Sequence, residues 1–360
     1  MEALKNSPVK LIAMIRSLYT LGLATLLLVA GCKSDKKEQP ASEPNNPSPP
    51  APEVKVDAPE FSADSAYAFV EKQVAFGPRV PGTPEHKACG DWLVAQGKRL
   101  AGDGNVIEQS GRGRLYTGKV IDFRNIIIQF NKSAKQRVLL FAHWDSRLFG
   151  DHDPDPTKRK SPILGANDGA SGVGVLLEIG RLLKNHPLDN LGVDLVLLDA
   201  EDQGTPDNMN VNRNDDSFKT WCLGSQYWSK NVHRNAHFRF GILLDMVGAS
   251  DAEFPKEGNS VKYASRLTDR VWAIAKKLGY GNYFIDKQGT DILDDHYFIN
   301  TKTNIPTVDI IHYKGQTGTF GETWHTHDDN MDVIDPKTLK AVGETVTYVV
   351  YEESARMKTP

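Results

Sequence analysis

Apolar and polar stretches alternate along the chain after residue 60, and their spacing predicts strands and helices in turn. Short apolar runs of the kind found in buried strands lie at residues 105–109, 125–130, 138–143, 193–198, 238–246 and 305–311. Helical spacing or helix-capping residues mark 62–76, a segment from 84 onward, 169–183, 224–230, 261–278 and 336–357. Strands that alternate with long helices favour an α/β fold, a three-layer αβα sandwich around a mixed, mostly parallel central sheet.

The first 59 residues have a different pattern. A basic start precedes an apolar run at 21–30, and Val29-Ala30-Gly31-Cys32 resembles the lipobox of bacterial lipoproteins, in which the cysteine is lipidated. The apolar run is short for a membrane-spanning helix. We therefore expect residues 1–31 to be a cleaved signal peptide rather than a plain membrane anchor.

The next segment, residues 32–59, is rich in proline, serine and asparagine and cannot bury a core. We expect it to be a tether that begins at a lipidated Cys32. Residues 60–360 would then form the catalytic domain, attached to a membrane outside the cytoplasm, on the periplasmic side or at the outer membrane.

The amino-acid composition limits the possible partners and metal ligands of the protein. The chain has 360 residues, of which 39% are hydrophobic, enough for one large core. A net charge of -3 without long charged blocks argues against a nucleic-acid partner. Three cysteines without a Cys-x-x-Cys pair exclude a thiolate zinc site, so any metal must be held by carboxylates and imidazoles. Cys89 and Cys222 could form a disulfide, and buried free thiols are equally consistent with the sequence.

Carboxylates and imidazoles follow the ends of the predicted strands. Carboxyl ends of parallel strands share one edge of a sheet, so residues far apart in sequence can converge there. Each residue alone has a structural explanation: Asp168 could cap a helix, His143 could be a core histidine and Asp245 a turn residue. Together they favour a divalent metal site with an adjacent general base. The residues are His143, Asp145, Asp168, Asp199, Glu201, Asp202, Asp245 and His325.

Motifs in the same order resemble the zinc-dependent M28 peptidase family and, within it, the glutaminyl-peptide cyclotransferases. The resemblance covers residues 61 to 355. The motifs are Gly77-Pro78-Arg79-Val80-Pro81-Gly82, His143-Trp144-Asp145-Ser146, Asn167-Asp168-Gly169, Asp199-Ala200-Glu201-Asp202, Leu244-Asp245-Met246-Val247-Gly248, Asp294-Asp295-His296 and Trp324-His325-Thr326. The last two resemble the cyclase branch rather than the aminopeptidases.

The resemblance implies roles for four residues. Asp168, Asp202 and His325 match the zinc ligands, and two carboxylates with one imidazole suit one catalytic zinc with an open position. Glu201 matches the general acid/base, and its place beside a ligand keeps it close to the reacting group.

The resemblance also implies a substrate pocket. Asp245 matches the residue that holds the amino group of the substrate, and Trp324 and Trp221 resemble the aromatic walls. Trp221 fits a buried core position as well as a pocket wall. The acidic loop that starts at Asp151 is interpreted as the rim of the pocket.

Two positions depart from the animal cyclases. Asp309 stands where those enzymes have a histidine that bonds the first Asp of Asp-Asp-His. Asp294 and Asp309 would then share a proton, since two adjacent carboxylates cannot both ionise cheaply; an ordinary strand-edge role for Asp309 is the alternative. Asp202 replaces a glutamate and remains an oxygen ligand.

The implied reaction is the cyclisation of an amino-terminal glutamine to pyroglutamate with release of ammonia, on peptides or proteins. We expect the enzyme to be a monomer. An M28 aminopeptidase is the alternative. It would bind a second zinc through His143 and Asp245, and its Glu201 would activate water. A third interpretation, a binding lipoprotein with an inactive site, requires the loss of a ligand or of the base, and all four are present.

Overall fold

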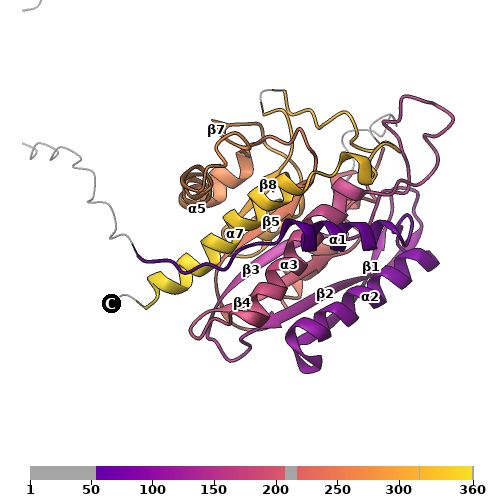
Figure 1. Cartoon of the computed structure of the whole chain (residues 1–360). Helices are drawn as coiled ribbons and strands as arrows, with labels where there is room; N and C mark the ends of the chain where they lie inside the picture. The colour runs from indigo at the N-terminus through magenta and orange to yellow at the C-terminus, as the bar shows by residue number, and fades with distance from the viewer. Residues whose placement is uncertain (1–53, 207–216, 316, 359–360) are drawn as a thin grey trace, which may run out of the picture. The chain divides into compact units, whose positions relative to one another are not determined.

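The computed structural model describes residues 54–206, 217–315 and 317–358 (Figure 1). The predicted signal peptide, Cys32 and most of the tether lie outside the described residues. Within the described ranges, every helix is too short or too polar to cross a membrane.

A six-stranded mixed sheet forms the centre of the domain. Its strand order is β1-β2-β4-β3-β5-β8. Strands β4, β3, β5 and β8 are parallel, whereas β1 and β2 form an antiparallel hairpin that joins the sheet through β4. The strands are β1 Val106–Arg114, β2 Val120–Phe130, β3 Gln136–His143, β4 Gly192–Leu198, β5 His237–Asp245 and β8 Thr307–Ile311.

Helices cover both faces of this sheet, and Figure 1 shows α1, α2, α3 and α7 over one of them. Successive side chains of a strand point to opposite faces, so Leu140 joins the large core under these helices while Leu139 joins a smaller core with α4 and α6. The expected three-layer α/β fold is confirmed. The helices are α1 Ala63–Val74, α2 Pro84–Ala101, α3 Gly172–Asn185, α4 Leu223–Lys230, α5 Gly258–Lys277, α6 Asp295–Lys302 and α7 Pro336–Arg356.

Several elements were not predicted from the pattern. A small parallel pair, β6 (Phe254–Lys256) and β7 (Phe284–Gln288), is too short to show a period, and α6 has only eight residues. The hairpin is longer than predicted because the outer part of β1 alternates between half-buried and exposed positions instead of apolar and polar ones. Single helical turns lie at Ala166–Ser171, Asp103–Asn105, Ser217–Thr220 and Met331–Val333.

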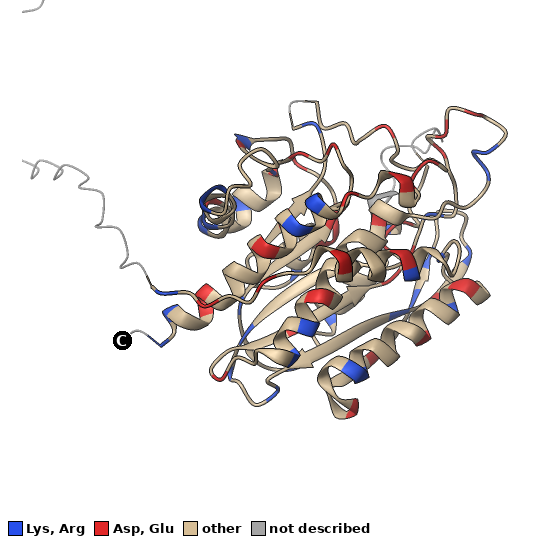
Figure 2. Cartoon of the chain, viewed as in Figure 1, with Lys and Arg blue, Asp and Glu red and all other residues tan. Residues whose placement is uncertain are grey.

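One edge of the sheet gathers the carboxyl ends of the parallel strands. Strand β3 ends at His143, β5 ends at Asp245, and the chain leaves β4 directly into Asp199. Helix α7 starts at the same edge, where the N–H of its N-cap residue Asp335 donates to the carbonyl of Gly248 at 2.8 Å. Ligand sites of α/β proteins lie at such an edge. In the view of Figure 2, acidic and basic residues are interspersed over the helical layer.

Candidate active site and metal centre

The turn after β4 is held in place by one buried carboxylate. Asp145 accepts hydrogen bonds from the backbone N–H of Glu201 at 3.0 Å, from that of Asp202 at 3.2 Å and from Gln203 Nε2 at 3.0 Å. Ala200 within this turn has a φ of 56°, a left-handed conformation that costs an alanine about 1–2 kcal/mol. The surrounding hydrogen bonds offset that cost and set the direction of the two carboxylates that follow.

Three of the predicted ligands converge on one point. One side-chain oxygen or nitrogen from each of Asp168, Asp202 and His325 lies within 4.8 Å of the others. His325 Nε2 is 3.1 Å from Asp202 Oδ1 and 3.7 Å from Asp168 Oδ2. The second oxygen of Asp202 is buried without a hydrogen-bond partner among the described residues. Two carboxylates and an imidazole are a donor set that fits catalytic zinc, and the unpartnered oxygen fits a cation beside it.

Residues behind these three side chains fix their orientation. The carboxylate of Asp329 accepts the backbone N–H of Asp168 at 3.1 Å. Asp151 Oδ1 lies 3.4 Å from His325 Nδ1. Arg147 donates hydrogen bonds to both oxygens of Asp151, from Nε to Oδ1 at 2.8 Å and from Nη2 to Oδ2 at 2.7 Å. Such outer partners hold the ring and the tautomer of a ligating histidine.

Sequence reasoning missed this supporting shell. Asp151, interpreted as part of a pocket rim, is instead buried against His325. Asp329 could have been suspected from its place in the acidic run after Trp324-His325, whereas no local signal marks Arg147. Arg147 donates to the carbonyl of Asp202, 55 positions away, and Asp329 accepts the N–H of Asn167, 162 positions away. Such separations are beyond the reach of any periodicity.

A second group of side chains adjoins the first. His143 Nε2 is 3.0 Å from Asp168 Oδ1 and 3.1 Å from Asp245 Oδ1, so Asp168 belongs to both groups. Burial lowers the pKa of His143, but hydrogen bonds to Asp145, Asp168 and Asp245 outweigh burial and raise the pKa well above its usual value. The pair of groups has the layout of two neighbouring cation positions.

The predicted general base faces this centre from the turn. Glu201 is buried, and burial together with the charges of Asp202 and Asp294 raises its pKa well above the usual range, although His143 acts in the opposite direction. The Sγ–H of Cys222 donates to Glu201 Oε1 at 3.2 Å, and the Cys222 N–H donates to the Glu201 carbonyl at 2.8 Å. A carboxyl group with a raised pKa can both take and return a proton near neutral pH.

Asp294 and Asp309 come together as the sequence suggested. Oxygens of both lie with a ring nitrogen of His296 within 4.8 Å, between the start of α6 and the edge strand β8. Burial raises the pKa of both carboxyls, and the charge of Asp294 raises that of Asp309 further. These directions fit the expectation that the two carboxyl groups share a proton, with the larger upward shift of the pKa at Asp309.

A cavity of about 260 Å³ opens over these groups. The ring of Trp324 stacks on that of His325, with centroids 3.6 Å apart and planes 24° apart. Asp168, Glu201, Asp202, Asp245 and Asp294 all reach the cavity, and its apolar wall consists of Met246, Ile292, Leu293, Ile311, Phe320, Trp221 and Trp324.

Trp221 lies in the pocket wall and not in the core. Its ring is parallel to that of His325, at 6.1 Å and 6°. Arg147 stacks over this ring, with the guanidinium carbon 4.6 Å from the ring centre. Gly204 permits this position, because a Cβ there would lie 1.9 Å from a ring atom of Trp221.

The two described cysteines are free. Cys89 and Cys222 are both buried and neither forms a disulfide. Of the two arrangements that the sequence allowed, the structure has buried thiols.

The sequence profile of peptidase family M28 matches residues 125–350. This chain belongs to peptidase family M28. A fruit-fly (Drosophila melanogaster) glutaminyl-peptide cyclotransferase is 24% identical to it over 286 residues, which is 72% of this chain and 73% of the fly protein.

Some proteins of known structure have a higher sequence identity to this chain than the fruit-fly enzyme has. A glutaminyl cyclase of Bacteroides thetaiotaomicron bound to N-acetylhistamine is 49% identical, with a TM-score of 0.76 over 82% of this chain and 99% of that one. A Zn-dependent exopeptidase of Parabacteroides distasonis is 48% identical, with a TM-score of 0.77 and the same shares. The expectation of zinc is confirmed by the similarity to this zinc-dependent enzyme and by the groups of possible metal ligands in the structure.

Proposed function

We propose that the protein is a zinc-dependent glutaminyl-peptide cyclotransferase that converts amino-terminal glutamine into pyroglutamate and releases ammonia. The observation that carries this proposal is the small tryptophan-walled cavity in which Glu201 and Asp245 face the Asp168–Asp202–His325 group. The similarity to the Bacteroides thetaiotaomicron cyclase over nearly all of that chain supports it.

Substrate binding follows from the lining of the cavity. Asp245 is only 8% exposed and points into the cavity, where it would accept hydrogen bonds from the α-amino group. Trp221 and Trp324 would enclose the glutaminyl side chain and exclude water. The nucleophile and the electrophile belong to one residue, so the main task of the pocket is to fold them together.

The metal would be held by Asp168, Asp202 and His325. When bound, zinc supplies a Lewis acid that polarises a carbonyl oxygen. Arg147 and Asp151 keep the His325 ring in one orientation, and Asp145 keeps Asp202 beside it.

Glu201 would move the proton. Its carboxylate takes a proton from the α-amine as the amine nitrogen forms a bond to the γ-amide carbon, and it returns the proton to the amide nitrogen as that carbon–nitrogen bond breaks. The leaving group is ammonia. Asp294 and Asp309 hold a further proton close to Glu201, since Asp294 and Glu201 belong to one cluster within 4.8 Å.

An M28 aminopeptidase is the second candidate, and one observation favours it. His143, Asp168 and Asp245 are assembled as a second metal-binding group would be. With that group filled, Glu201 would activate water and the product would be a free amino acid.

We further propose that the enzyme is a monomer attached outside the cytoplasm through a lipid on Cys32, and that peptides or proteins with amino-terminal glutamine are its substrates. The lipobox-like sequence before Cys32 and the polar tether after it support the anchor. When cells that express a Cys32→Ala variant are fractionated, the protein should no longer be found in the membrane fraction.

One experiment separates the two activities. The purified protein is incubated with a glutaminyl peptide and a leucyl peptide while ammonia, free leucine and bound zinc are measured. Ammonia release without leucine release, at one zinc per chain, is the expected result. Leucine release at two zinc ions per chain would refute the cyclase and establish the aminopeptidase.

A further inference from the structure

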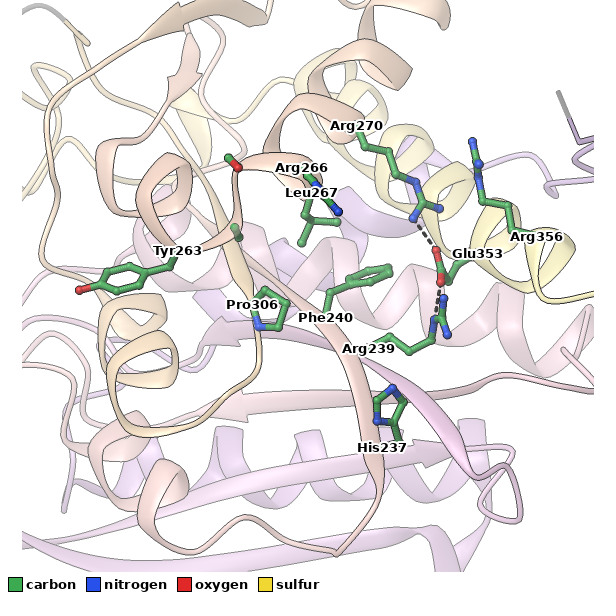
Figure 3. Close-up of a pocket in the computed structure, with 12 residues that line it drawn as sticks. His237, Arg239, Phe240, Tyr263, Arg266, Leu267, Arg270, Pro306, Glu353 and Arg356 are labelled. Carbon is green, nitrogen blue, oxygen red and sulfur yellow. Dashed lines mark hydrogen bonds and ion pairs between the residues drawn. The ribbon is translucent and has the colours of Figure 1, made fainter. Parts of the chain in front are cut away.

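A second cavity lies at the other end of the domain from the active site. It encloses about 710 Å³ between the start of β5, the middle of α5 and the end of α7 (Figure 3). Arg239 lines it, and Asp245 of the active site lies six residues further along the same strand, a separation of about 20 Å at the rise of a β-strand. A ligand here would leave the catalytic cavity open.

The lining of this cavity has an apolar part and a basic part. Figure 3 shows Phe240, Leu267 and Pro306 in its middle and a group of arginines around Glu353 on one side. Phe240 and Leu267 are buried, whereas Arg266 is exposed at the rim. The four arginines of the lining are Arg239, Arg266, Arg270 and Arg356.

The acidic groups beside the cavity are already saturated. Glu353 accepts Arg239 with one oxygen and Arg270 with the other. Glu352 accepts Arg270 at 2.8 Å and Arg356 at 3.2 Å. Three arginines therefore share two carboxylates, and Arg356 Nε remains buried without a hydrogen-bond partner among the described residues.

Arg266 adds a further positive charge to the lining of the cavity. Within the described ranges it has no ion-pair partner, and it stands four residues before Arg270 on α5, where like charges repel by about 0.2–0.5 kcal/mol. Four arginines against two glutamates leave two positive charges around one cavity. Such an excess beside an apolar surface is the complement of a doubly charged anion with an organic body.

We propose that this cavity binds a phosphate monoester. A monoester carries nearly two negative charges at neutral pH, and guanidinium groups match phosphate oxygens with paired N–H donors. Arg266 at the rim donates to the phosphate, Arg356 adds positive charge on the other side of Glu353, and the organic part packs on Phe240 and Leu267. This inference is independent of the proposed reaction.

Calorimetric titration of the full-length protein with glycerol 3-phosphate tests the proposal. Arg266→Gln and Arg356→Gln should each weaken binding about tenfold, while Arg99→Gln, an exposed arginine of α2 that bonds Gln96, should leave the affinity unchanged. Added salt should weaken binding further. Ammonia release should be the same in all variants, which separates this site from the proposed function. No measurable binding, or equal affinities in Arg266→Gln and Arg99→Gln, would overturn the proposal.

Soluble and lipid phosphates are the two sources of this chemistry, and further titrations distinguish them. Inorganic phosphate and dihexanoyl phosphatidic acid below its micelle concentration serve as probes. Tighter binding of the short-chain lipid than of glycerol 3-phosphate identifies a lipid headgroup. Equal or weaker binding of the lipid identifies a soluble phosphate ester. Lipid binding that persists in Arg266→Gln and Arg356→Gln counts against the site.

Discussion

Two buried ionic clusters of this protein contrast sharply. At the amino-terminal ends of the parallel strands, Arg137 donates to both oxygens of Asp194 and to the carbonyls of Phe130 and Asn131. His233 also belongs to the group, with its Nε2 3.1 Å from Asp194 Oδ2. Burial alone would raise the pKa of Asp194, but the hydrogen bonds from His233 and Arg137 outweigh burial and lower it.

The active-site cluster has the opposite character. It is rich in carboxylates, and several of its buried polar atoms lack partners among the described residues, including oxygens of Asp202, Asp294 and Asp309. Burial and mutual repulsion raise the pKa values of Asp245, to about 7, and of Asp202, to about 6. Hydrogen-bonded, charge-balanced groups serve stability, whereas a cluster of carboxylates that can hold a cation and protons serves chemistry.

The largest difference between the two clusters is expected when Glu201, the proposed general acid/base, is replaced. Glu201→Gln should lower ammonia release about 10²–10⁴-fold, because the amide cannot take up the proton of the amine. Zinc content should stay the same and the thermal midpoint should not fall, since the amide keeps the size of the side chain and replaces a buried carboxyl group whose pKa is raised. Glu71→Gln, at an exposed position of α1, is the control. Activity within tenfold of the parent would remove Glu201 from the mechanism.

Removing Arg137 from the hydrogen-bonded cluster with Asp194 and His233 should lower stability without affecting turnover. Arg137→Met leaves Asp194 buried without its main partner and should cost about 3–5 kcal/mol of unfolding free energy, measured by denaturant titration. Arg112→Met removes an exposed pair with Asp122 and should cost less than about 1 kcal/mol. Turnover per folded molecule should be unchanged in both. A loss below about 1 kcal/mol in Arg137→Met would contradict the comparison.

Replacing Asp309 should stabilise the fold, whereas replacing Arg137 should destabilise it. Its pKa is raised in the folded state, so its stabilising contribution is complete below the unfolded value of about 4 and is lost as pH rises toward the folded value. Asp309→Asn should therefore stabilise the fold at pH 8, by an amount on the order of 1 kcal/mol or more, and have little effect at pH 4. Thermal unfolding at both pH values measures this.

Glu257, which bonds His296 next to Asp309, is the matched contrast. Burial raises its pKa, but His296 and backbone N–H groups outweigh burial and lower it to about 2. Its contribution is therefore present above pH of about 4 and is lost as pH falls toward 2. Glu257→Gln should destabilise the fold at pH 8. Destabilisation by Asp309→Asn at the same pH would contradict the assignment of the proton to Asp309.

The smallest effect is expected at Cys222. Cys222→Ala removes the S–H donor to Glu201 and should lower kcat several-fold, equivalent to about 1 kcal/mol. Cys222→Ser keeps a donor and should recover most of the loss. Because Cys222 is buried and burial raises its pKa well above the usual value, the native thiol should resist iodoacetamide. Equal losses in the two variants would exclude the hydrogen bond as the cause.

Residues that end a strand could be predicted to share a site. Asp168, Asp202 and His325 are together because parallel strands end at one edge. The pairing of Asp294 with Asp309 was expected only from the resemblance to the cyclases. The unpredicted members, such as Arg147 and Asp329, act through hydrogen bonds that span large sequence separations, which no local pattern encodes.

By itself, the sequence determined the class of fold, the order of its main elements and the acidic residues of the site, because periodicity and strand ends are local properties. Tertiary structure alone decided which strands are neighbours, where the antiparallel hairpin joins, how His143 comes to share Asp168, and that arginines from β5, α5 and α7 meet around one cavity. The physical reason is that charge balance and hydrogen-bond saturation depend on distances between segments, and only packing sets those distances.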